Sequence, residues 1–145
     1  MAAPITLATG ISAEPQAVFE ALSTSTGLAS FWTRDSKAEP EVGSVAVFGF
    51  GPTRLEMRID DLTPGRRVAW TCLSDFPMEP HYWQGTTVSW ELVADGQGGA
   101  RLLLQHGNWP EALPQADVAS TAFAWALVLR ALKSFAETGS AQPVF

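Results

Sequence analysis

Between residues 36 and 106, apolar and polar side chains alternate with a period of two, and clusters of turn residues interrupt this alternation about every ten residues. In the segment RLEMRIDDL, Leu55, Met57 and Ile59 fall on one side of an extended chain, and charged residues occupy most positions between them. Successive side chains of a strand point to opposite faces, so the pattern gives strands with one apolar and one solvated face. The segment therefore predicts an antiparallel meander whose apolar face must pack against another element.

The longest helical pattern, over residues 117–139, supplies that element. Asp117 is the expected cap and Gly139 the expected stop. At about 1.5 Å per residue such a helix is roughly 33 Å long, enough to cross a whole sheet. The SAQPVF tail beyond it is expected to be loose. Apolar residues recur along the helix at helical spacing, namely Val118, Ala122, Trp125, Val128, Leu129, Leu132 and Phe135.

The start of the chain predicts one strand and two short helices. Residues 5–11 alternate and are rich in β-branched side chains, which is typical of a strand. Ser12 as a cap and Pro15 in the first turn predict a helix, and residues 24–32 predict a second, brief one. Together the segments predict an α+β fold in which a curved antiparallel sheet wraps a long C-terminal helix. A curved sheet contacts a helix well at one end and leaves space at the other, so we expect a cavity there.

Composition narrows the classes of protein and partner. The chain has 145 residues, 46% of them hydrophobic, so we expect a single domain over 1–145 with its core at about 5–139. Nine Lys and Arg against fifteen Asp and Glu give a net charge of −6, which argues against nucleic acid and anionic membranes as partners. Cys72 is the only cysteine, so neither an internal disulfide nor a thiolate zinc site can form. With no export or membrane-spanning signal, we expect a soluble cytoplasmic protein.

Three segments together resemble a known superfamily. They are ISAEPQAVFEALSTSTGLASFW, DDLTPGRRVAWT, and GGARLLLQHGNW leading into FAWALVLRALKSF. In this order they are similar to the SRPBCC, or START-like, superfamily, and within it to the branch named after the C-terminal domain of the heat-shock ATPase activator. The likeness runs from Ile5 to Gly139 and implies a helix-grip fold with an elongated cavity between the sheet and the long helix. Members of the superfamily include lipid and hormone binders, cyclase relatives and co-chaperone domains, so the fold alone does not fix the function.

Aromatic residues are abundant, with six tryptophans and eight phenylalanines. Their wide apolar surfaces suit either a thick core or a lined pocket. Strand parity turns Trp70 and Trp90 inward, and element ends or loops place Trp32, Trp83 and Trp109 where they can close a pocket mouth. The expected ligand-binding residues are Trp32, Met57, Trp70, Trp83, Trp90, His106, Trp109, Phe123 and Leu127.

His106 ends the apolar run LLLQH, and strand parity places it on the inner face with Leu102 and Leu104. We expect it to be a cavity-wall residue that gives a ligand one polar contact and tolerates replacement by glutamine. Catalysis needs an orienting group within hydrogen-bond reach, and no acid follows the strand pattern nearby, so a catalytic role requires that Tyr82, the sole tyrosine, or an acid lies beside His106. His81 lies in SDFPMEPHYWQG, which we interpret as a lid or rim. Its spacing from other ligand types matches no metal motif, so no metal site is expected.

Three functions fit these features. The leading hypothesis is binding of a small hydrophobic, aromatic or lipid-like molecule in the cavity. The first alternative is a cyclase-like or hydrolase-like enzyme that uses the same cavity, with His106 as acid or base. The second is a protein-interaction, co-chaperone-like module, which an exposed apolar patch outside the cavity would favour. The GFG and GQGG stretches lie between strands and fit hairpin turns, so no cofactor is expected. Aromatic edges make a homodimer reasonable.

Overall fold

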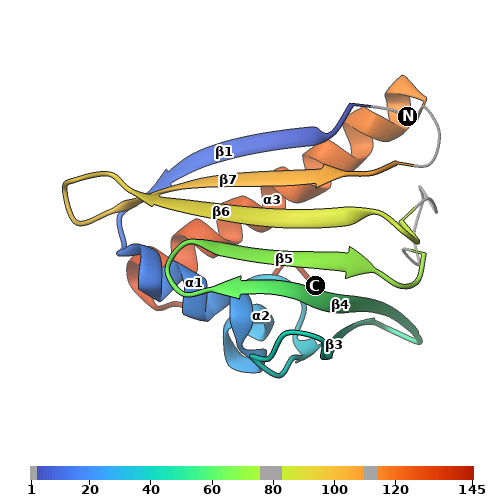
Figure 1. The fold of residues 1–145 in the computed structure, drawn as a ribbon, viewed down its shortest axis with the longest axis horizontal. Coiled ribbons are helices and arrows are strands. Elements are labelled where there is room, and N and C mark those ends of the chain that lie inside the picture. Colours follow the sequence, from blue (N-terminus) through green and yellow to red (C-terminus); the bar gives the residue numbers. More distant parts are fainter. Residues whose placement is uncertain (1–2, 76–82, 110–113) are drawn as a thin grey trace.

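The computed structural model describes residues 3–75, 83–109 and 114–145 (Figure 1). Within these ranges the chain forms a seven-stranded antiparallel sheet in the order β1-β7-β6-β5-β4-β3-β2. The predicted α+β class and meander are confirmed, because β2 to β7 pair in chain order. β1 pairs with β7 and forms the edge of the sheet opposite β2. The strands are β1 Ile5–Ile11, β2 Asp35–Lys37, β3 Val45–Phe50, β4 Thr53–Thr63, β5 Arg67–Cys72, β6 Thr87–Ala94 and β7 Ala100–Gly107.

The predicted inward face of the meander is confirmed in β4. Leu55, Met57 and Ile59 are buried, and the charged side chains between them are exposed. After Ile59 the pairing of β4 with β5 shifts by one residue, so that Asp61 rather than Asp60 continues the register. Such a bulge increases strand twist and bends the sheet, which gives the sheet a concave face on its apolar side.

α1 (Pro15–Ser23) follows β1 as predicted, but Ser12 is not its cap. Glu14 holds the N-cap position and Pro15 is the first helical residue, which suits proline because that position needs no N–H. The Ser12 backbone N–H instead donates to Glu137 Oε2 over 2.8 Å and ties the end of β1 to the C-terminal helix.

α2 (Ser25–Phe31) follows after a single residue, Thr24, whose side chain caps the new helix by accepting from the Gly27 N–H at 3.1 Å. The corner is tight. A Cβ atom on Gly27 would lie 2.4 Å from the carbonyl oxygen of Ala21, so only glycine permits this approach of α2 to α1.

α3 (Gln115–Thr138) is the predicted long helix. Pro114 occupies the N-cap, so the expectation that Asp117 is the cap is wrong, although Asp117 lies in the first turn near the positive end of the dipole. Gly139 does end the helix, with φ 75° and its N–H donating to Phe135 O at 2.7 Å. One stripe of α3 is buried: Thr121, Trp125, Val128, Leu129 and Leu132.

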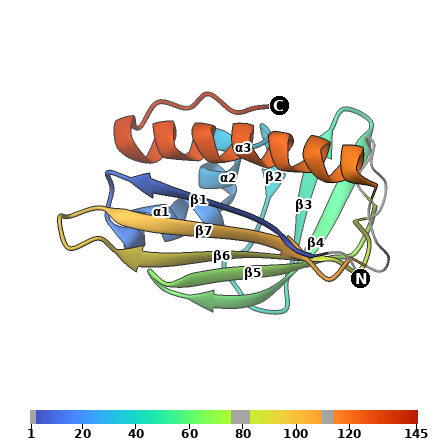
Figure 2. The ribbon, with the colours of Figure 1, turned by 90° about the horizontal axis from the view of Figure 1, so that it is seen from above.

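α3 lies across the concave face of the sheet, and α1 and α2 lie beside it at one end of the molecule (Figure 2). The tail turns back along the side of α3 that faces away from the sheet. It is not loose: Val144 N–H donates to Phe31 O (3.2 Å) and Phe145 N–H to Trp32 O (2.8 Å). The tail therefore fixes the end of α2, and with it Trp32, over the concave face.

Candidate functional site

Four buried tryptophans from four elements occupy the centre of the space between sheet and helix. They are Trp32 after α2, Trp70 on β5, Trp90 on β6 and Trp125 on α3, and we call them the tryptophan quartet. Their ring centroids are 6.1 Å apart for Trp32 and Trp70, 5.6 Å for Trp70 and Trp90, 5.6 Å for Trp90 and Trp125, and 5.4 Å for Trp125 and Trp32. The contacts form a closed circuit that joins sheet and helix, each pair contributing about 0.5–1.5 kcal/mol beyond its burial.

A second group surrounds His106 at the end of β7, and we call Trp83, Thr86, His106 and Trp109 the histidine cluster. The His106 ring lies edge-on to Trp83 at 4.4 Å and tilted against Trp109 at 4.2 Å. Trp125 joins the two groups, because it stacks on Trp83 at 5.6 Å while also belonging to the quartet. The quartet and the histidine cluster thus form one continuous aromatic assembly.

Hydrogen bonds in the histidine cluster define the state of the His106 ring. Trp125 Nε1, which can only donate, lies 3.0 Å from His106 Nδ1, so Nδ1 is an acceptor and the ring proton is on Nε2. Nε2 donates to Thr86 Oγ1 at 2.8 Å, and the Thr86 hydroxyl in turn donates to the carbonyl oxygen of Trp83 at 2.6 Å. Trp109 Nε1 donates to the backbone oxygen of His106 at 3.0 Å. Both ring nitrogens of His106 therefore have protein partners.

Burial lowers the pKa of His106 to about 3, so the imidazole is neutral at any ordinary pH. A proton on Nδ1 would also point at the Trp125 N–H, and two donors would then face each other. His106 has no exposed surface. It is a core residue that orients its neighbours, and it has no free nitrogen to offer a ligand or a reacting proton.

Two other buried polar atoms in the interior are unpaired. Within the described residues, Trp90 Nε1 and Thr121 Oγ1 are buried and have no hydrogen-bond partner. Trp90 belongs to the quartet, and Thr121 lies one turn before Trp125 on the buried stripe of α3. Leaving such a group unsatisfied costs about 1–3 kcal/mol, so native interiors rarely keep one without a reason.

The structure brings together most of the residues that the sequence nominated. Trp32, Met57, Trp70, Trp83, Trp90, His106 and Trp109 are all buried around the concave face. Phe123 and Leu127 are not among them, because they are 66% and 38% exposed on the opposite side of α3. Each is two residues from Trp125, and two residues turn an α-helix by more than half a revolution. Tyr82 and His81 lie outside the described residues.

Three residues of the site were not nominated from the sequence. Trp125 was expected only as a member of the apolar stripe of the long helix, and it is the link between the quartet and the histidine cluster. Thr121 could have been found, because it lies four residues before Trp125 and so shares its face. Thr86 had no such signal, since it precedes β6 and its role comes from a residue twenty positions away.

The structure gives no support to metal or thiol chemistry in the part of the chain it describes. No three His, Cys, Asp or Glu side chains come together there in a way that could hold an ion. Burial raises the pKa of the Cys72 thiol to about 12, so it is not a thiolate nucleophile.

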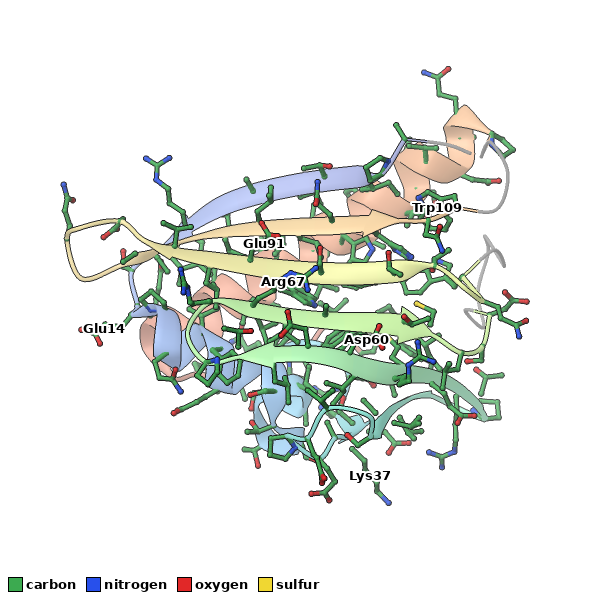
Figure 3. All side chains as sticks on the ribbon, viewed as in Figure 1. Glu14, Lys37, Asp60, Arg67, Glu91 and Trp109 are labelled. Carbon is green, nitrogen blue, oxygen red and sulfur yellow. The ribbon has the colours of Figure 1, made fainter. Side chains whose placement is uncertain are left out.

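The outer face of the sheet is polar. Arg67 bridges Asp61 (2.9 Å) and Glu91 (3.6 Å) across three strands (Figure 3). The hydrogen bonds from Arg67 and from Thr63 lower the pKa of Asp61. Exposed pairs of this kind contribute at most about 1 kcal/mol each, so this face is a solvated surface.

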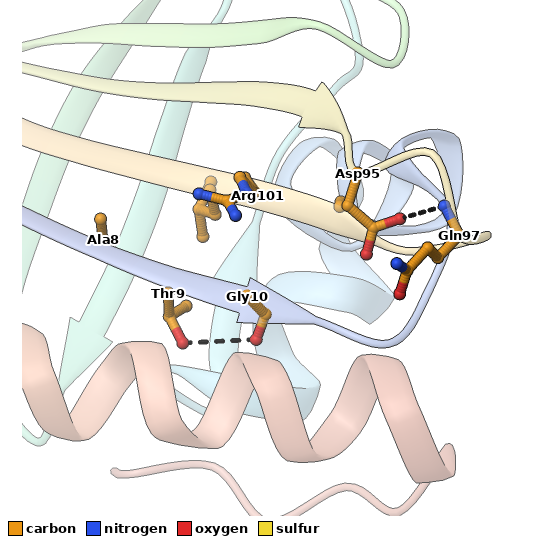
Figure 4. A pocket seen from close by; sticks show the side chains of 8 residues that line it. Ala8, Thr9, Gly10, Asp95, Gln97 and Arg101 are labelled. Atoms are coloured by element: carbon orange, nitrogen blue, oxygen red, sulfur yellow. Dashed lines mark hydrogen bonds between the residues drawn. The ribbon is translucent and has the colours of Figure 1, made fainter.

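A shallow surface pocket lies where β1 meets the β6–β7 hairpin (Figure 4). Asp95 closes the hairpin by accepting from the N–H groups of Gln97 (2.7 Å) and Gly99 (2.9 Å), which lowers the pKa of its carboxyl. None of the nominated residues lines it. The interior between sheet and α3 therefore remains the candidate site.

The architecture, a curved antiparallel sheet around a long C-terminal helix, is that of the SRPBCC superfamily. The family model of activator of Hsp90 ATPase homolog 1-like proteins matches residues 12–137, and the chain belongs to this family. The resemblance predicted from the sequence is thereby confirmed.

Solved structures agree. The Aha1 dimer from Colwellia psychrerythraea is 30% identical, with 94% of this chain and 98% of that chain covered and a TM-score of 0.78. Protein SSP2350 from Staphylococcus saprophyticus (15% identity, 97% and 96% covered, TM-score 0.79) shares the fold. So does DynU16, a putative protein in the dynemicin biosynthetic locus (20% identity, 95% of this chain and 48% of that chain covered, TM-score 0.74). Among curated proteins no match is found.

Proposed function

We propose that this protein binds a small, flat, apolar molecule that carries a hydrogen-bond acceptor, in the space between the sheet and α3. The observation that carries the proposal is the pair of buried, unpartnered polar atoms on β6 and α3, Trp90 Nε1 and Thr121 Oγ1. Trp90 lies against the rings of Trp70 and Trp125, which suits a ring-containing ligand. The family often binds hydrophobic ligands, which supports the same reading.

The energetics allow such a ligand to enter. The quartet rings touch one another, so a ligand that reaches Trp90 has to separate at least one pair and loses its stacking, about 0.5–1.5 kcal/mol, in addition to the cost of moving the packed side chains apart. Satisfying one buried donor recovers about 1–3 kcal/mol. Burial of the ligand's own apolar surface adds about 25 cal/mol per Å². The balance favours a ligand with a carbonyl or ether oxygen over a pure hydrocarbon of the same shape.

The nominated residues then take different roles. Trp32, Met57, Trp70 and Trp90 are the wall that a ligand contacts. His106 holds Trp83, Trp109 and Trp125 in place and does not itself contact the ligand. Phe123 and Leu127 take no part, because they lie on the other side of α3.

The enzyme alternative finds no support in the described residues. The side-chain partners of the His106 ring are Thr86 and Trp125, and neither is an acid, a base or a phenol. A neutral imidazole with both nitrogens occupied does not transfer a proton to a substrate.

A second function, association with another protein, is favoured by specific observations. Phe123 and Leu127 expose apolar surface outside the ligand site, and the 30% identical relative from Colwellia psychrerythraea was solved as a dimer. We propose that this chain also forms a homodimer.

α3 is long and apolar enough to cross a membrane by length and composition alone. One stripe of α3 packs on the sheet, as in the core helix of a soluble protein, and this supports our proposal that the protein is cytoplasmic.

The ligand proposal is tested with two molecules of the same shape, 9-fluorenone, which carries a carbonyl acceptor, and fluorene, which lacks it. Displacement of the dye 1-anilinonaphthalene-8-sulfonate and the change of tryptophan emission both report binding. We expect fluorenone to bind at least about tenfold more tightly than fluorene, the equivalent of one good hydrogen bond.

Thr121→Val keeps the shape of the site and removes a hydroxyl, and Trp90→Phe removes the indole N–H while keeping an aromatic, though smaller, ring. We expect Trp90→Phe to abolish the preference for fluorenone while fluorene binding is unchanged, and Thr121→Val to reduce it. Phe123→Ala, on the far side of α3, is the matched control and should bind both molecules like the wild type. Equal affinity of the wild type for the two molecules, or binding of neither, would contradict the proposal.

A further inference from the structure

The outer side of α3 carries a second apolar seam, opposite the stripe that packs on the sheet. Its spacing of three and four residues is the spacing of a helix that packs against another helix. Only 28% of the most apolar eighteen residues of α3 are buried, and the others are half-buried or exposed in the single chain. The seam, which we call the outer seam, consists of Ala116, Ala119, Phe123, Ala126 and the flanking Leu127, all exposed.

Part of the outer side of α3 is covered by the chain itself. Gln142 and Val144 of the tail line a groove together with Leu127, Arg130 and Ser134. Figure 2 shows the tail running back along the C-terminal half of α3 and ending near the middle of the helix. Among the described residues no element covers the half that bears Phe123, whose side chain is 66% exposed.

We propose that the outer seam is the homodimer interface, with the α3 helices of two copies packed antiparallel about a two-fold axis at Phe123. The proposal rests on the homodimer of the preceding subsection and assigns its surface. A two-fold interface must be self-complementary, because each residue pair occurs twice. With the axis at Phe123, Phe123 meets its own copy and the small Ala119 lies opposite the large Leu127.

Charge favours a second copy over other partners. The chain carries a net charge of −6, so two copies repel over most of their surfaces. None of the five residues of the seam is charged, so two seams meet without like charges between their members. An anionic membrane would have to attract the same acidic protein, and interfacial helices normally need basic residues on their polar face. α3 has only Arg130 and Lys133, and Lys133 is paired with Glu137 at 2.7 Å.

The first test is sedimentation velocity of the full chain over a hundredfold range of concentration. A contact made mainly by one helix face is smaller than a standard interface, so we expect dissociation at about micromolar concentration. Phe123→Glu should weaken dimerisation at least about tenfold, as expected for removing a central aromatic anchor. The matched control is Val93→Glu, because Val93 on β6 is exposed to a similar extent, 63%, but lies on the sheet. Thermal unfolding of both variants checks that they fold.

The second test locates the axis. Phe123→Cys places one thiol at the proposed axis, and Cys72 does not interfere because it is buried. We expect mild oxidation to give a disulfide-linked dimer of Phe123→Cys and only monomer of a Val93→Cys control. A wild-type dimer that survives Phe123→Glu and does not cross-link through position 123 would overturn the assigned surface while leaving the homodimer intact. A wild type that is monomeric throughout would overturn both.

A third arm separates a membrane from a second copy. Wild type and Phe123→Glu are mixed with vesicles of phosphatidylglycerol and phosphatidylcholine and floated on a density gradient. We expect neither to float. Flotation of the wild type that Phe123→Glu abolishes would assign the outer seam to lipid and overturn the proposal.

Discussion

The interior of this protein contains two tryptophan-rich regions that differ in one respect, the pairing of their polar atoms. In the histidine cluster each ring nitrogen of His106, the hydroxyl of Thr86 and the indole N–H of Trp109 has a partner at 2.6–3.0 Å. At Trp90 and Thr121, equally buried polar atoms have none among the residues that the structure describes. The comparison teaches that burial alone does not distinguish a structural polar group from a binding one. The cluster supports the fold, whereas the unpaired atoms are the ones that we propose to bind a ligand.

The largest expected loss of stability comes from substitution in the histidine cluster, where the polar atoms are paired. His106→Ala removes the acceptor of the Trp125 indole and leaves a cavity between Trp83 and Trp109. We expect a loss of about 3–5 kcal/mol in the free energy of unfolding, measured by urea denaturation at pH 7. His106→Gln should also destabilise the protein, since glutamine cannot fill the place of the ring. A loss below about 1 kcal/mol for His106→Ala would show that the cluster is not structural.

Acid should destabilise the protein through the same residue. The folded pKa of His106 is about 3 and the unfolded value is 6.5, so between these limits the unfolded chain binds the extra proton. Stability is therefore fully present above pH 6.5 and falls as the pH falls toward 3. Between pH 6.5 and 4.5, above the range where most carboxylates titrate, the loss should be about 2–3 kcal/mol at about 1.4 kcal/mol per unit.

The control for this pH dependence is the His106→Gln variant, which has no ring to titrate. Its stability should change far less over the same interval. An equal slope in the wild type and in His106→Gln would assign the acid sensitivity to other groups.

The smallest expected change of stability comes from substitution of Trp90 and Thr121, whose polar atoms are unpaired. Trp90→Phe removes an indole N–H that has no partner, so the lost hydrogen bonding costs nothing and the smaller ring costs little. We expect a change within about 1.5 kcal/mol of the wild type, against 3–5 kcal/mol for His106→Ala. Thr121→Val should be neutral or slightly stabilising. A loss of about 3 kcal/mol or more for Thr121→Val would mean that its hydroxyl has a structural partner.

Much of this molecule follows from periodicity in the sequence. Strand parity correctly placed Leu55, Met57 and Ile59 on the buried face, and it correctly turned His106 inward, because a two-residue period leaves no choice once one face is apolar. The long helix and its end at Gly139 followed in the same way, since only a residue that tolerates positive φ closes a helix so readily.

The errors come from questions that periodicity does not answer. Ser12 and Asp117 have the residue types of caps, but the backbone begins its helices at Glu14 and Pro114, and the position of the turn decides this. Phe123 and Leu127 were assigned to the cavity, but α3 is apolar on two sides. Only the packing on the sheet shows which side is buried.

The partners of His106 were also beyond the sequence. Parity shows that the ring points inward, but Thr86 and Trp125 reach it from other elements through tertiary structure. An inward histidine with free nitrogens can face a ligand in a cavity, whereas one with both nitrogens hydrogen-bonded to the protein has a structural role. The sequence is the same in both cases.

The most direct test of this account is the set of six indole N–H signals in a ¹H–¹⁵N correlation spectrum, assigned by single tryptophan-to-phenylalanine variants and recorded with and without 9-fluorenone. We predict that the Trp90 signal alone moves downfield, because its N–H gains an acceptor. The Trp109 and Trp125 signals should keep their positions to within the small shifts that a nearby ring causes, since both N–H groups already bond to His106. A spectrum in which Trp90 does not move, or in which Trp125 leaves its histidine and moves instead, would contradict the account.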